Sequence, residues 1–175
     1  RISFPLAFNS LAFWAMSGIN RLISFNFIGP ELNAYLGVAN KFTLVVSVFI
    51  NVYALAWQEK ALDEYKNEIK ENIYSDMITK FIFILCTIIS LYEFAIKIIF
   101  PYYIDANFQK SFHLIPVLLI STAISGISSI FGVLFTVEQK TSKIISSTTA
   151  GCIVNILFTC LTVKYLNVYT IPISL

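Results

Sequence analysis

The stretch that decides the fold runs from Phe112 to Val137 and reads FHLIPVLLISTAISGISSIFGVLFTV. It contains no Asp, Glu, Lys or Arg, and the nearest charged residues are Lys110 before it and Glu138 after it. A helix of this length, rising about 1.5 Å per residue, crosses the roughly 30 Å hydrocarbon core of a bilayer. The stretch is therefore predicted to be a transmembrane helix.

Four further charge-free runs occur along the chain, and charged residues mark their ends. A charge near the bilayer centre costs roughly 2.5 to 3.5 kcal/mol on insertion. The five predicted spans are residues 3–27, 35–57, 77–100, 112–137 and 144–165, with Gly29 and Pro30 ending the first helix. Because 57% of the residues are apolar and only 13% are charged, about half the charged share of a soluble domain, the chain is predicted to be an all-α, multi-spanning membrane bundle.

The longest connection alternates acids and lysines and places Leu62, Tyr65, Ile69 and Ile73 at helical spacing. This pattern predicts an amphipathic helix over residues 58–74 that lies at the membrane surface. Lysine and arginine are more frequent on the side of the membrane that holds this connection, as the positive-inside rule requires of the cytoplasmic side. The N-terminus is therefore expected to be cytoplasmic as well.

Several functional classes lose support from the same composition. A net charge of +2, with basic residues scattered along the chain, does not suggest a nucleic-acid partner. Cys86, Cys152, Cys160 and His113 show no spacing typical of metal ligands, so neither a metal nor a cofactor is predicted. No nucleophile with a base and no paired carboxylates occur within a span, and the chain is not expected to be an enzyme.

Polar residues inside the spans recur at three- and four-residue spacing and so line faces of the helices. Such faces either form hydrogen bonds between helices or line a cavity. In the fourth span, Ser121, Ser125, Ser129 and Gly132 form a ridge of small residues that is expected to allow close helix packing. The polar stripes of the other spans are Ser10, Trp14, Ser17, Arg21 and Ser24; Asn40, Thr43, Ser47 and Asn51; Cys86, Ser90, Glu93 and Lys97; and Thr148, Gly151, Asn155, Thr159 and Thr162.

Six residues are candidates for substrate binding. Inserting an ionisable group or an amide into the membrane costs free energy, so such residues within spans commonly have a function. Two structural alternatives remain open: Arg21 could extend its side chain to the interface, and Glu93 could neutralise Lys97 one turn away. The candidates are Asn20, Arg21, Asn40, Asn51, Glu93 and Lys97.

Short motifs in the first two spans carry a resemblance to a known family. They are PLAFNSLA at residues 5–12, GINR at 18–21, IGP at 28–30, YLGVANKF at 35–42 and AWQE at 56–59. Their order resembles helices seven and eight of bacterial oligosaccharide flippases in the multidrug, oligosaccharidyl-lipid and polysaccharide exporter superfamily. The spacing of all five spans is similar to that of helices seven to eleven.

The resemblance implies five spans of one lobe in a two-lobed transporter, with an N-terminal lobe of the same protein missing from this fragment. It further implies a bacterial cytoplasmic (inner) membrane location, contact with membrane lipid, and an undecaprenyl diphosphate-linked oligosaccharide as cargo for surface polysaccharide synthesis. The family often has Asp where this chain has Asn20. A drug or cation antiporter of the superfamily and a membrane enzyme of the polysaccharide pathway are the alternatives.

The resemblance and the polar stripe together predict that Arg21 acts through its positive charge. Arg21→Lys should keep partial export of repeat units, because a lysine still attracts a diphosphate but lacks the bidentate fork, whereas Arg21→Gln should lose most export. Surface polysaccharide is measured at matched expression. Export by Arg21→Gln at the parental level would make Arg21 an interfacial anchor.

Overall fold

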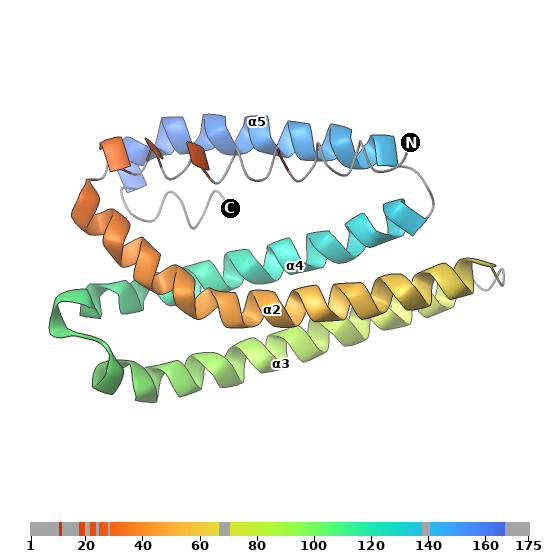
Figure 1. The fold of residues 1–175 in the computed structure, drawn as a ribbon, viewed down its shortest axis with the longest axis horizontal. Coiled ribbons are helices and arrows are strands. Elements are labelled where there is room, and N and C mark those ends of the chain that lie inside the picture. The colour runs from red at the N-terminus through yellow and green to blue at the C-terminus, as the bar shows by residue number, and fades with distance from the viewer. Residues whose placement is uncertain are drawn as a thin grey trace.

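This computed structural model describes residues 29–66, 71–137 and 141–166, together with positions 11, 18–19, 22–23 and 25–27. In that part of the chain the secondary structure is helical and contains no strand, so the all-α prediction is confirmed there (Figure 1). The elements are α2 (Pro30–Lys66), α3 (Glu71–Tyr103), the 3-10 helix η1 (Ala106–Leu114), α4 (Ile115–Val137) and α5 (Thr141–Leu166).

Three helical segments are long and apolar enough to cross a membrane: Pro30–Leu62, Ser75–Tyr103 and Ala106–Val137. They contain the predicted spans 35–57, 77–100 and 112–137. The predicted span 144–165 corresponds to α5, whose apolar part, Ile145–Leu161, is shorter. The predicted span 3–27 lies largely outside the described residues. Length and composition therefore mark this chain as a helical membrane protein.

The break predicted at Gly29 and Pro30 is where α2 begins. Gly29 has a φ of 100°, a left-handed conformation that side chains other than glycine rarely adopt. Pro30 is the first residue of α2, a position where its missing N–H removes no helical hydrogen bond. The Gly29 carbonyl accepts the first hydrogen bond of the helix, from the N–H of Asn33 at 3.2 Å.

The predicted surface helix over residues 58–74 is not a separate element. Helix α2 continues without interruption through Gln58 to Lys66, and residues 71–76 form the first turns of α3. No Gly or Pro lies between residues 58 and 66 to end the helix. At 37 residues, α2 rises about 55 Å, well beyond the hydrocarbon core. Its charged last turns therefore project from the membrane.

The tightest packing joins α2 and α4, which run parallel (Figure 1). Apart from Tyr35 and Leu118, which are also buried, their buried residues follow steps of three, four or seven, the repeat of a coiled-coil seam. We call these two lines the seam. On α2 they are Leu36, Ala39, Thr43, Val46, Ile50, Trp57 and Ala61, and on α4 they are Ile115, Leu119, Gly126, Ile130 and Val137. The closest approach is at Gly126, where an added Cβ would lie 2.7 Å from the Cδ1 atom of Ile50.

Helix α3 runs antiparallel to α2 and packs through aromatic side chains. The rings of Phe42 and Phe100 lie 5.4 Å apart, and those of Tyr53 and Phe81 lie 4.6 Å apart. Two tyrosines bond the helices reciprocally: the Tyr92 hydroxyl donates to the Phe42 carbonyl at 2.9 Å, and the Tyr53 hydroxyl donates to the Met77 carbonyl at 3.4 Å. These contacts at two levels hold α2 and α3 together along their length.

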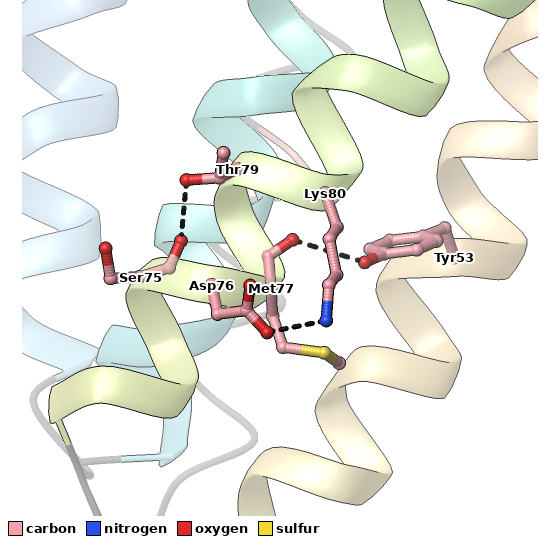
Figure 2. A network of polar contacts seen from close by, with 6 residues as sticks. All are labelled: Tyr53, Ser75, Asp76, Met77, Thr79 and Lys80. Atoms are coloured by element: carbon pink, nitrogen blue, oxygen red, sulfur yellow. Dashed lines mark hydrogen bonds and ion pairs between the residues drawn. The ribbon is translucent and has the colours of Figure 1, made fainter.

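The Tyr53 contact lies beside the N-terminal turns of α3 (Figure 2). Asp76 and Lys80, one turn apart, form an ion pair of 2.6 Å there, and the Thr79 hydroxyl donates to the Ser75 carbonyl. Both charged side chains are mostly exposed, so solvent screens the pair and it adds little to stability. Its position marks this end of α3 as the polar end of the span.

The close contact of Gly126 with Ile50 predicts opposite effects for two identical substitutions on α4. Gly132→Ala should raise the melting temperature, because its Cβ meets nothing within 4 Å and alanine favours a helix by roughly 0.5 to 1 kcal/mol. Gly126→Ala should lower it, since overpacking costs about 1 to 3 kcal/mol. Ile50→Val, which removes Cδ1 but keeps the Cγ1 and Cγ2 atoms at 3.1 and 3.2 Å, should restore part of the stability in the Gly126→Ala background. Equal stabilisation by both alanines would contradict the close contact.

Candidate functional site

The polar residues of α2 lie beside the seam. Asn40, Ser47 and Asn51 each follow a seam residue by one position, so they lie about 100° further around the helix. Asn40 and Asn51 are exposed and Ser47 is half-buried, whereas Thr43 of the predicted stripe is buried within the seam. The seam is thus apolar apart from Thr43, and the predicted stripe forms its flank.

Helix α4 has a matching polar flank. Ser125, Ser129 and Thr136 each precede a seam residue by one position and therefore lie on one side of the seam. Ser125 and Ser129 are exposed. The ridge of small residues predicted for close packing thus borders the contact with α2, while Gly126 makes that contact.

The two polar flanks lie on the same side of the α2–α4 pair. When two helices run parallel, a residue that follows the seam by one position on the first helix lies on the same side of the pair as a residue that precedes the seam by one position on the second helix. Asn51 follows Ile50 and Ser125 precedes Gly126, so both border the closest contact of the two helices. We call this surface, formed by Asn40, Ser47, Asn51, Ser125, Ser129 and Thr136, the polar face.

Helix α3 occupies the opposite side of the pair. Its aromatic contacts involve Phe42 and Tyr53, and Phe42 precedes the seam residue Thr43 by one position. Half-buried Ile127, which follows Gly126, lies on that same apolar side of α4. Figure 1 shows α5 on the other side of the α2–α4 pair from α3. The polar face therefore points away from α3.

The polar face lies at the depth of the membrane core. On α2, the charged residues nearest to Asn51 are Lys41 and Glu59, and Ser47 and Asn51 lie between them. Leu44 also follows a seam residue by one position and lies on the same flank, whereas the exposed apolar residues Val48, Val52 and Leu55 lie further around the helix and are suited to lipid. One helix thus presents an apolar surface and a hydrogen-bonding surface at the same depth.

Three of the four hydroxyl groups of the polar face, those of Ser47, Ser129 and Thr136, use their donors within their own helices. The Ser47 hydroxyl donates to the Thr43 carbonyl at 3.1 Å, the Ser129 hydroxyl to the Gly126 carbonyl at 2.7 Å, and the Thr136 hydroxyl to the Gly132 carbonyl at 3.0 Å. The Asn51 carboxamide has no such bond to any described residue. Because an unpaired amide in hydrocarbon costs several kcal/mol, the surroundings of Asn51 must supply donors and acceptors.

The six candidate binding residues fall in three places. Asn20 and Arg21 lie outside the described residues. Asn40 and Asn51 lie on the polar face, whereas Glu93 and Lys97 are exposed on α3, off its buried line. Among the described side chains, Glu93 and Lys97 do not form an ion pair with each other. The structure therefore brings the two asparagines onto one surface and leaves the charged pair on another helix.

The stripe predicted on α5 is divided. Asn155 and Thr159 are buried, Thr148 is half-buried, and Gly151 is exposed. The side chain of Thr162 lies outside the described residues. Helix α5 thus buries amide and hydroxyl groups, in contrast to the apolar seam of α2 and α4.

Ser125, Ser129 and Thr136 were not candidates from the sequence, although their spacing relative to the buried line was visible. Serine fits both tight packing and a polar lining, and only the position of Gly126 assigns the packing role. Prediction of the polar face also needed the parallel direction of α2 and α4, because this direction decides whether their two polar flanks lie on the same side of the pair.

The hydrogen-bond pattern predicts that Asn51 contributes little to stability. Asn51→Leu should leave the melting temperature of the purified protein unchanged or raise it, because no described hydrogen bond is lost. Tyr92→Phe should lower it, since the bond to the Phe42 carbonyl contributes roughly 0.5 to 1.5 kcal/mol. If Asn51→Leu lowers the melting temperature as much as Tyr92→Phe does, Asn51 forms a structural hydrogen bond. Its side chain is then not available for binding.

Comparisons with protein-family models, with curated proteins and with solved structures gave no match to this chain.

Proposed function

We propose that this chain is one lobe of a transporter that moves lipid-linked oligosaccharide repeat units across the bacterial cytoplasmic membrane. The single observation that carries the proposal is the polar face, which places amide and hydroxyl groups of two helices on one side of a tightly packed pair. The resemblance of residues 5–12, 18–21 and 35–42 to oligosaccharide flippases supports the same function.

A polar face at bilayer depth favours transport over simple anchoring. Amides and hydroxyls at this depth are costly when they face lipid, and an anchor gains nothing from them. A translocation path for a hydrophilic cargo needs such groups, because they replace the water that the cargo loses. Exposed Asn51 and Ser125 beside the closest contact of α2 and α4 meet this need.

The packing supports a mode of movement for this lobe. The seam joins α2 to α4, and two reciprocal tyrosine bonds join α2 to α3. Helices held in this way move as one body, as alternating access requires of each half of a transporter. In the proposed topology the chain has five spans with a cytoplasmic N-terminus, and the connection between α2 and α3 is cytoplasmic.

The proposal predicts a specific phenotype for the full-length protein in its host. Deleting the gene should abolish surface polysaccharide and cause complete lipid-linked repeat units to accumulate. Asn51→Leu should reproduce most of that loss at normal expression and normal stability, because a leucine cannot form hydrogen bonds with the cargo. The matched control is Val52→Leu, one residue along on the lipid-facing line, which should export at the parental level.

Other outcomes identify the alternatives. Accumulation of incomplete repeat units would indicate an enzyme of the pathway. Normal polysaccharide together with increased drug sensitivity would indicate a drug or cation antiporter. Either result contradicts the proposed function.

A further inference from the structure

We propose that the polar face binds the neutral sugar portion of the cargo and that the diphosphate is held elsewhere. This inference rests on the proposed function and assigns one part of its substrate to one surface. The surface is defined by Asn51 and Ser125, which border the contact between Ile50 and Gly126 on the same side of the helix pair.

The chemistry of the face is neutral over the depth of the membrane core. Between Lys41 and Glu59 on α2, and along all of α4 from Ile115 to Val137, no residue carries a charge. A diphosphate is bound by arginine or lysine, or by backbone N–H groups at a helix N-terminus. Asn51 and Ser125 lie within their helices, and the face offers no cation. The face therefore lacks the groups that a diphosphate requires.

A sugar suits the same groups. Each sugar hydroxyl both donates and accepts hydrogen bonds, and so does a carboxamide. The hydroxyl donors of Ser47, Ser129 and Thr136 are already used within their helices, which leaves oxygen lone pairs free to accept bonds from sugar hydroxyls. The Asn51 carboxamide adds a donor with no partner among the described residues. Donors and acceptors are thus both present without any charge.

The small side chains of α4 leave space beside these groups. Ser125 and Ser129 are exposed, and a Cβ added at Gly132 would meet nothing within 4 Å. A bulky sugar ring needs such space next to the amide. The neutral chemistry and the room on the α4 flank are both compatible with a sugar as the occupant.

Cysteine protection tests the inference. The full-length protein is reconstituted in lipid nanodiscs in a functional background in which every native cysteine, including Cys86, Cys152 and Cys160, is replaced. Ser125→Cys should react with a hydrophilic maleimide, whereas the neighbouring control Ile124→Cys, on the lipid-facing side, should react at least about tenfold more slowly because a thiolate does not form in hydrocarbon. Lipid-linked repeat units extracted from the deletion strain are the first probe, and undecaprenyl diphosphate without sugar is the second.

The inference predicts that the lipid-linked repeat unit removes most labelling of Ser125→Cys and that undecaprenyl diphosphate alone removes little. Equal protection by both probes would place the diphosphate or the lipid at the face and overturn the sugar assignment, while the proposed function stands. An unreactive Ser125→Cys, or labelling that neither probe changes, would also overturn it. Failure of repeat units to accumulate in the deletion strain refutes the proposed function itself, and the inference with it.

Discussion

The contact between Ile50 and Gly126 is the constraint on which the rest of the structure depends. Two apolar helices gain no hydrophobic free energy by meeting inside lipid, so their association relies on close van der Waals packing. A glycine provides it here, since even a methyl group would come within 2.7 Å of the isoleucine side chain. The contact fixes the rotation of α2 and α4 about their axes, and that rotation decides where every other side chain points.

The consequences of that rotation are chemical. With Ile50 and Gly126 turned inwards, the aromatic residues of α2 meet α3, and Tyr53 and Tyr92 find backbone carbonyls to bond. On the other side, Asn51 and Ser125 are turned to one common surface. The lobe thus separates its functions by face: the seam and the aromatic side supply stability, and the polar face carries groups that stability does not need. Sites of function commonly have this character.

Hydropathy and charge were sufficient to predict the three helices of the described part that are long and apolar enough to cross a membrane, because the cost of burying a charge in lipid is large and local. The break at Gly29 and Pro30 was predicted for an equally local reason, the conformations these two residues favour. The continuation of α2 through residues 58–66 was not predicted, because an alternation of acids and lysines suits both an interfacial helix and the end of a long one. Gly126 was not singled out, since its role depends on a partner 76 positions away, at Ile50. Asn51 and Ser125 lie on the same side of the helix pair only because α2 and α4 run parallel. The spacing of residues within one helix does not reveal the direction of its neighbour.

The central claim is that the polar face of α2 and α4 lines a path for hydrophilic cargo. A cryo-electron microscopy structure of the full-length protein in a lipid nanodisc tests this most directly, because it shows which side chains contact acyl chains. We expect acyl density against Val48, Val52 and Ile124, and water, cargo or other polar groups against Asn51 and Ser125. Acyl chains packed directly on Asn51 and Ser125 would contradict it.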